Sequence, residues 1–230
     1  MKFEKVSPES VGMSAEQLLK ARDYAERVGK LLESSGGAAL VTRYGKTVGE
    51  WYWGKRGGSA DAPPYDKDTL TPLMSVTKGV TATALALLIQ DGVVWLDEPV
   101  STYVPEFREG DLAKVTIRHL ATHSSGLPGG DIDFYGCWRD KRPDESLPET
   151  CFRHAIYRVV RGVVYEPGTW HVYSDPAVTI LGEVLFRSCG QRVPEYVKQR
   201  VFDPLGLKRI GWEFEESIVD DIAEIINADW

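Results

Sequence analysis

The chain has 230 residues, of which 43% are hydrophobic and 27% charged, a composition typical of a globular protein with a substantial core. The net charge is −7, and the acidic excess lies in residues 213–230, which hold seven acidic residues and no basic one. Because no basic cluster and no run of about 18 apolar residues occurs, the sequence argues against a nucleic-acid partner, an anionic membrane surface and a membrane span.

The first third of the sequence predicts a helix followed by a hairpin. Ser14 and Gln17 have the spacing of a capping box, apolar residues follow at helical spacing, and Gly36-Gly37 ends the pattern. Two extended runs come next, 38–43 and 47–53, separated by a short glycine-containing turn. This arrangement predicts an antiparallel hairpin.

The rest of the chain predicts mainly helices. Residues 76–90 are apolar or small on nearly all sides, which is typical of a buried helix. Further helices are expected where a capping residue or a proline precedes a helical pattern: 117–122, 148–160, 176–190 and 194 to about 202. For the third of these, Asp175 is the expected N-cap.

Two features bear on where the protein works. The first residues lack the apolar segment of a secretory signal. The cysteines, Cys137, Cys151 and Cys189, are odd in number and have no CxxC spacing, which fits free thiols in a reducing compartment. We therefore expect a cytoplasmic protein.

The sharpest chemical candidate is the motif Ser75-Val76-Thr77-Lys78, placed where an extended segment turns into the apolar helix. A hydroxyl there lies at the positive end of the helix dipole, near backbone N–H groups without helical partners. Lys78, one turn later, lies on the same face, where an apolar surrounding lowers the pKa of its amine. The alternative is ordinary: Ser75 caps the helix and Lys78 is solvated.

A second candidate lies in the segment 166–175. Of all ten tyrosines, only Tyr173 is followed two positions later by Asn or Asp, here Asp175, and it lies in a loop just before an expected helix. A rigid loop can fix an exposed phenol oxygen in place. The alternative is that the ring of Tyr173 packs and Asp175 only caps the helix.

His119 and His123 are four residues apart, the spacing of two metal ligands on one helix face. However, Leu120 stands where a zinc protease motif needs Glu, and no third ligand is near. Capping or packing is the favoured interpretation of both histidines.

Several blocks in a fixed order carry a family resemblance. The chain resembles the N-terminal part of the serine β-lactamase and penicillin-binding-protein superfamily, nearest the class C β-lactamase-related esterases and amidases. The resembling blocks are residues 72–78, 92–100, 115–128, 166–175 and 202–207.

This resemblance implies an α+β, β-lactamase/transpeptidase-like fold, with an antiparallel sheet flanked by helices beside an all-helical lobe. It assigns 1–91 to the α/β part, 92–212 to the helical lobe and 213–230 to an acidic connection that is cut short.

The same resemblance implies roles for the candidate residues. Ser75 is the acylated nucleophile, Lys78 takes its proton, and Tyr173 shuttles protons and later activates water. Asp175 stands where the family usually has Asn, in the substrate-binding position. An ionised carboxylate there raises the pKa of Lys78 and opposes a neutral-base role.

A second departure is larger. The family's third motif, a Lys-Thr-Gly or His-x-Gly strand that faces the nucleophile, does not occur before Trp230. A hairpin alone is only marginally stable, and the apolar helix needs a sheet to cover it, which points to the same deficit. We therefore expect the C-terminal strands to be missing, and the chain alone to have weak activity or none.

The function expected is that of a serine hydrolase acting through an acyl-enzyme on a small carboxylic ester or amide. Trp170 and Trp138 are candidates for an apolar acyl pocket. No metal or organic cofactor is implied, and the oligomeric state is left open. Two alternatives remain at this point: a non-catalytic or truncated relative that binds a ligand or partner, and an unrelated helical binding domain.

Overall fold

The computed structural model describes residues 3–212 and 216–224 of the chain. The chain forms two compact units, one of Met1–Leu73 with Leu205–Trp230 and the other of Met74–Pro204. None of the helices in the described part of the chain combines the length and the apolar composition of a membrane-spanning segment.

The sequence-based division at 91/92 and 212/213 stays a prediction. Part of its acidic connection, residues 213–215 and 225–230, lies outside the described residues.

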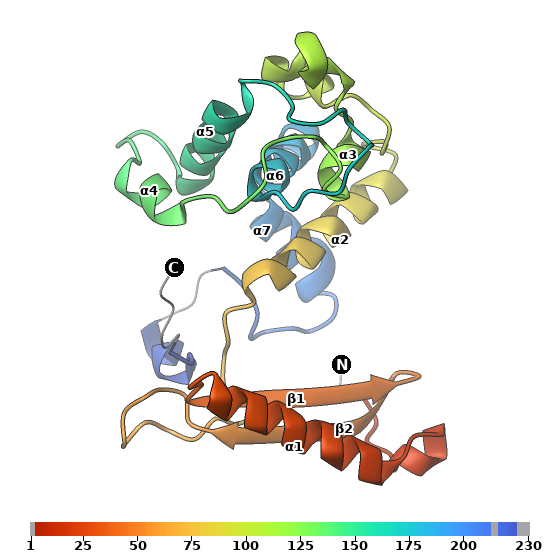
Figure 1. Ribbon diagram of the computed structural model, residues 1–230, viewed down its shortest axis with the longest axis vertical. Helices are drawn as coiled ribbons and strands as arrows, with labels where there is room; N and C mark the ends of the chain where they lie inside the picture. Colours follow the sequence, from red (N-terminus) through yellow and green to blue (C-terminus); the bar gives the residue numbers. More distant parts are fainter. Residues whose placement is uncertain (1–2, 213–215, 225–230) are drawn as a thin grey trace. The chain divides into compact units, whose positions relative to one another are not determined.

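In its described part, the first unit consists of a helix packed on a two-stranded antiparallel sheet (Figure 1). Ser14 caps the helix, because its side chain accepts the backbone N–H of Gln17 at 3.3 Å, as the sequence predicts. The elements in chain order are a 3₁₀ turn (Pro8–Val11), α1 (Ala15–Leu31), β1 (Gly36–Arg43), β2 (Lys46–Gly54) and a second 3₁₀ turn (Glu216–Asp221).

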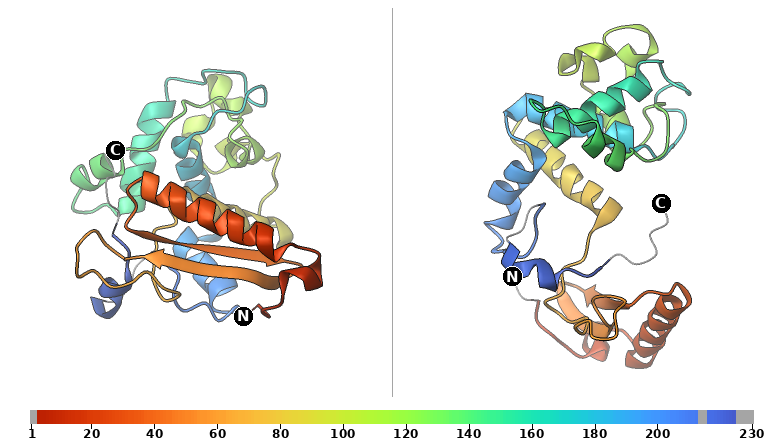
Figure 2. Two further views of the ribbon diagram at one scale, coloured as in Figure 1. Left: turned by 60° about the horizontal axis from the view of Figure 1, so that its bottom comes forward. Right: turned by 90° about the vertical axis from the view of Figure 1, so that its left-hand side faces the viewer.

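The hairpin of β1 and β2 is confirmed. Its register ends at the pair Arg43 and Lys46, and both residues of the connecting turn, Tyr44 (φ 52°) and Gly45 (φ 70°), are left-handed. Such a turn matches the right-handed twist of the two strands. The helix α1 lies along this hairpin, as the two further views in Figure 2 also show.

An ion-pair cluster ties the 216–224 segment to the loop after the hairpin within the first unit. Arg56 contacts Asp66 at 3.0 Å and Asp221 at 2.7 Å, and its side chain is only 12% exposed. A bridge between Leu70 and Ile222 adds backbone hydrogen bonds to this connection. Contacts between residues far apart in sequence therefore stabilise this unit.

The second unit is helical. Its helices are α2 (Thr77–Gln90), α3 (Ile117–Ala121), α4 (Phe134–Arg139), α5 (Leu147–Val159), α6 (Asp175–Cys189) and α7 (Val193–Val197), the last continuing into a π-helical turn (Lys198–Phe202). Short 3₁₀ turns at Met74–Val76, Val100–Thr102, Pro105–Phe107 and Gly110–Lys114 complete the unit.

The core of this unit is built around α6, which packs against α2, α3, α5 and α7 (Figure 1). Four apolar residues of α6, at helical spacing, are at most 2% exposed: Ile180, Leu181, Val184 and Leu185. Because α6 is the central helix, the loop that leads into it is held firmly at its start.

The 76–90 helix is buried on one face only in the described chain, not on all sides, in line with the sheet that the sequence analysis finds missing. The face of α2 with Thr81, Ala84, Leu85 and Leu88 is buried, whereas the face with Ala82 and Ala86 is exposed. An absence of polar residues shows only that a helix tolerates burial. The neighbours, here α6 and α7, decide which face is covered.

The other helices follow the sequence prediction to within a few residues, and α4 was not predicted. One detail of α6 is a correction. Its N-cap is Ser174, whose Oγ accepts the N–H of Ala177 at 3.2 Å, so Asp175 is not the cap. Ser174 has the extended backbone that a cap requires, and Asp175 already belongs to the first helical turn.

Candidate active site

Ser75 lies at the start of α2, in the 3₁₀ turn Met74–Val76, with its side chain exposed. The residue before it, Met74, has φ 46°, a left-handed conformation that is strained for a residue other than glycine. The N-cap position of α2 is Val76, and no side chain caps the helix. The alternative that Ser75 is an ordinary helix cap is therefore wrong.

The hydroxyl of Ser75 has two polar partners instead. Lys78 Nζ donates a hydrogen bond to Ser75 Oγ at 3.1 Å, as expected for residues one helical turn apart. Tyr173 Oη lies 2.7 Å from the same oxygen, within hydrogen-bonding distance. The structure thus brings together the hydroxyl, the amine and the phenol that the sequence singled out, although Ser75 and Tyr173 are 98 residues apart.

Lys78 also contacts Asp175. Its Nζ lies 2.7 Å from Asp175 Oδ1, and the two side chains are 23% and 12% exposed. No hydrogen bond with favourable angles reaches the buried Oδ1, so this contact is best described as an ion pair. Nζ further lies 4.7 Å from the centre of the Tyr173 ring, a cation–π contact.

These contacts decide the charge of Lys78. Burial lowers the pKa of its amine, but the contacts with Asp175 and Tyr173 outweigh burial and raise the pKa above its usual value. At neutral pH Lys78 is therefore positively charged, and the neutral amine is a minor form.

The segment that carries Tyr173 is fixed at its backbone on one side by residues 128–130. Gly130 N–H donates to the carbonyl of Tyr173 at 3.0 Å, and Asp175 N–H donates to the carbonyl of Gly130 at 3.0 Å. Ser174 Oγ donates to the carbonyl of Pro128 at 2.8 Å. Tyr173 is thus presented by a rigid loop, as the sequence indicated.

Sequence reasoning missed His123 as part of this site. Its imidazole stacks on the ring of Tyr173, with centroids 4.8 Å apart and planes at 27°. Its Nδ1 accepts the N–H of Ser174 at 3.2 Å, and its carbonyl accepts the N–H of Val172 at 2.8 Å. The spacing of His119 and His123 gave no sign of this, because the contact depends on a left-handed backbone at His123, φ 54°.

His119 has the capping role that the sequence favoured. Its Nδ1 accepts the backbone N–H of Thr116 at 3.2 Å, while Thr116 Oγ1 accepts the N–H of His119, so the two form a capping box for α3. Among the described residues, no group of three or more His, Cys, Asp or Glu side chains is placed to hold a metal ion.

The predicted pocket residues Trp170 and Trp138 have exposed side chains. Trp170 is 65% exposed and its ring lies 6.1 Å from that of Tyr165, whereas Trp138, on α4, is 73% exposed. Within the described chain, no hydrogen bond or ring contact joins either tryptophan to Ser75, Lys78 or Tyr173. Their role in substrate binding stays a prediction.

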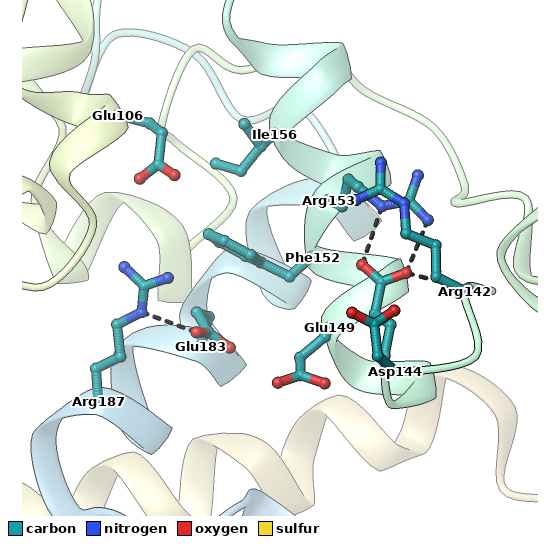
Figure 3. Close-up of a pocket in the computed structure, with 10 residues that line it drawn as sticks. Glu106, Arg142, Asp144, Glu149, Phe152, Arg153, Ile156, Glu183 and Arg187 are labelled. Carbon is teal, nitrogen blue, oxygen red and sulfur yellow. Dashed lines mark hydrogen bonds and ion pairs between the residues drawn. The ribbon is translucent and has the colours of Figure 1, made fainter. Parts of the chain in front are cut away.

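A cavity of about 440 Å³ lies elsewhere in the second unit, beside α5 and α6 (Figure 3). Charged side chains line it, but the most buried are paired: Arg153 with Glu145 at 2.8 Å, and Arg187 with Glu183 at 2.8 Å. The hydrogen bonds from Arg153 lower the pKa of Glu145 to about 2. The first pair links α5 to the turn that precedes it, and the second lies within α6. None of the residues lining the cavity belongs to the cluster around Ser75.

Comparison with known proteins connects this geometry to a family. The protein family described as Beta-lactamase matches residues 24–226. Esterase EstB of Burkholderia gladioli is 33% identical over an alignment of 192 residues, and the match covers 77% of this chain and 47% of that protein. The chain spans about half the length of the curated relatives it matches.

Two solved structures share the fold. The octameric penicillin-binding protein homologue from Pyrococcus abyssi is 26% identical with a TM-score of 0.74, and the match covers 90% of this chain and 47% of that one. The β-lactamase/D-alanine carboxypeptidase from Pseudomonas syringae is 26% identical with a TM-score of 0.71, covering 88% and 53%. The predicted β-lactamase/transpeptidase-like fold is confirmed, and the alternative of an unrelated helical domain is wrong.

Proposed function

Because the chain belongs to the β-lactamase family of hydrolases, we propose that Ser75 is the nucleophile of a serine hydrolase that acts through an acyl-enzyme. The observation that carries this proposal is the position of Ser75 Oγ, which lies 2.7 Å from Tyr173 Oη and 3.1 Å from Lys78 Nζ. A nucleophilic hydroxyl needs a neighbouring group that receives its proton, and two candidates lie within hydrogen-bonding distance.

In the first step Ser75 Oγ attacks the carbonyl carbon of the substrate, and its proton passes to whichever neighbour is unprotonated, the phenolate form of Tyr173 or the neutral amine form of Lys78. The Oγ–carbon bond forms, the bond from that carbon to the leaving oxygen or nitrogen breaks, and the carried proton goes to the leaving alcohol or amine. Water then attacks the acyl-enzyme, releases the acid and returns the proton to Ser75. Tyr173 and Lys78 are the proposed proton carriers in both halves of the reaction.

The pairing with Asp175 limits what Lys78 does in this scheme. A general base must be unprotonated, and the contact with Asp175 favours the protonated amine. As an ammonium group, Lys78 still donates to Ser75 Oγ and places a positive charge beside the forming alkoxide. The ion pair with Asp175 therefore limits the action of Lys78 as a general base at neutral pH.

The proposed substrate is a small carboxylic ester or amide. The support is that Esterase EstB, by its name an esterase, is 33% identical to this chain. A cytoplasmic location is part of the same proposal and is supported by the three free thiols, Cys137, Cys151 and Cys189. The oligomeric state stays open.

The test is covalent labelling of Ser75. The folded chain is treated with a fluorophosphonate and with a penicillin, and the adduct is located by mass spectrometry of peptides. We expect one adduct, on Ser75, that is absent in Ser75→Ala. Because the chain spans about half the length of its relatives, the protein encoded by the longest available reading frame that contains it is labelled in parallel.

Absence of an adduct from both proteins, when each is folded by circular dichroism, would contradict the proposal. That result would favour the alternative of a non-catalytic relative that binds a ligand or partner. Hydrolysis of p-nitrophenyl acetate and of a matching anilide then distinguishes esters from amides as substrates.

A further inference from the structure

One residue, His123, contacts three consecutive residues around the phenol. Its carbonyl accepts the N–H of Val172 at 2.8 Å, its Nδ1 accepts the N–H of Ser174 at 3.2 Å, and its ring stacks on that of Tyr173 at 4.8 Å. His123 thus holds three consecutive residues, 172–174, through its imidazole ring and its backbone carbonyl.

The backbone of His123 is strained to make these contacts. With φ 54° it is one of few residues other than glycine that are left-handed in the described chain. Such a conformation persists only where the surrounding contacts over-determine it, and it is often found at functional sites. In this conformation both the carbonyl and the ring of His123 face the 172–174 segment.

The contacts of His123 differ from the other supports of this loop. Residues 128–130 hold the loop through its backbone and through the side chain of Ser174. Among the described residues, the ring contacts of Tyr173 are the stack with His123 and the cation–π contact with Lys78. Lys78 also bonds Ser75. Of these two contacts to the Tyr173 ring, the one from His123 is therefore made by a residue that does not bond the proposed nucleophile.

The hydrogen bond from Ser174 requires a neutral imidazole with its proton on Nε2, because Nδ1 must accept. Protonation would place a second donor opposite the N–H of Ser174. The charged or titratable groups that face His123 are His171, at 5.8 Å between ring centroids, and Lys78, Asp175 and Tyr173. Burial, His171 and Lys78 lower the pKa of His123, and Asp175 opposes them, so the ring is neutral at pH 7.

We infer that His123 is a positioning residue that aims Tyr173 at Ser75, and that it does so only while its imidazole is neutral. This inference rests on the proposed function, since Tyr173 needs a fixed position only if it exchanges a proton with Ser75. A displacement of about 1 Å at a reacting group can lower a rate roughly a hundredfold, so even a partial release of Tyr173 is measurable.

Two variants separate the two contributions of His123. His123→Asn keeps a side-chain acceptor and tolerates a left-handed backbone, but it does not titrate and lacks the stacking ring. His123→Phe keeps a stacking ring but has no acceptor for Ser174. The matched control is His119→Asn, which removes a histidine with the same kind of bond, Nδ1 to a backbone N–H at 3.2 Å, away from Tyr173.

The readout is kinact for fluorophosphonate labelling of Ser75 between pH 5 and 8. In the wild type we expect a loss of rate on acidification, with its midpoint at the titration of His123 followed by imidazole NMR. In His123→Asn the inflection at this midpoint disappears, and only the steady rise of the rate with pH that titration of Lys78 gives is left. In His123→Phe, kinact is about tenfold lower across the range, with unchanged affinity for the probe. His119→Asn keeps the wild-type profile.

An acid inflection that persists in His123→Asn, or a kinact of His123→Phe equal to that of the wild type, overturns the inference. A second measurement is independent of any reactivity at Ser75: hydrogen exchange of the Ser174 amide at pH 7.5. We expect it to be about tenfold faster in His123→Phe and unchanged in His119→Asn. Equal exchange in His123→Phe also overturns the inference, whereas absence of labelling with altered exchange refutes the proposed function alone.

Discussion

The variant Asp175→Asn tests how far the ion pair with Lys78 limits the reactivity of Ser75. The carboxylate lies 2.7 Å from Nζ, and it raises the pKa of the lysine. An opposite charge at such a distance shifts a pKa by roughly one to three units. Replacing the carboxylate by a neutral amide removes this contribution, so the pKa of Lys78 falls.

Below its pKa, a fall of one unit increases the neutral fraction of an amine about tenfold. If neutral Lys78 receives the proton of Ser75, the rise of the labelling rate with pH moves to lower pH in Asp175→Asn. At pH 7.5 the rate of fluorophosphonate labelling then increases about tenfold. Since Ser174, not Asp175, caps α6, the substitution leaves the cap in place.

The assay is the rate of fluorophosphonate labelling between pH 6 and 10, with melting temperatures measured alongside. The matched control is Asp91→Asn, which removes a carboxylate that pairs with Arg200 at 2.5 Å and does not contact Lys78. A profile for Asp175→Asn that superimposes on the wild type, or that is slower at every pH, would refute the reasoning. A slower profile would mean that the charge on Lys78, not its neutral form, assists Ser75, and an identical profile would mean that Asp175 does not limit Ser75.

Two further predictions concern stability. In Gly126→Ala, the added Cβ would lie 2.0 Å from the carbonyl oxygen of Tyr165, and the backbone at this position is left-handed, φ 73°. We therefore expect a loss of more than about 2 kcal/mol in the free energy of unfolding, measured with urea. The control is Gly190→Ala, where the backbone is also left-handed but the space is open, and an equal loss in both variants would contradict the steric reason. Glu145, with a pKa of about 2 in the folded chain against 4.5 normally, adds stability above pH 4.5 that disappears as the pH falls toward 2. The difference in urea midpoint between wild type and Glu145→Gln should therefore shrink from pH 7 to pH 2.5, and a constant difference would show that the carboxylate charge is not the cause.

Local signals in the sequence were sufficient for most of the elements. Ser14 and Thr116 mark helix starts through short-range hydrogen bonds that each segment makes by itself. The turn at Tyr44 and Gly45 sets the hairpin in the same way. The convergence of Ser75, Lys78 and Tyr173 was predictable because ordered motifs resembled those of a known family.

The remaining details depend on tertiary contacts. Whether Ser174 or Asp175 caps α6 cannot be read from two adjacent capping residues, and the choice left Asp175 available for Lys78. The exposed face of α2 follows from the placement of α6 and α7. The stacking of His123 needs a left-handed backbone that a sequence pattern does not encode.

The bond between Ser75 and Tyr173 joins residues 98 positions apart, one before α2 and one before α6. Closure of so long a loop is a late and entropically unfavourable event in folding, so chemical reactivity at Ser75 should arise only after α2 and α6 have docked. When a serine-directed probe is added during refolding, the time at which it begins to label Ser75 would thus report when the helical unit has assembled. Far-ultraviolet circular dichroism, which detects helices before they dock, would record an earlier time.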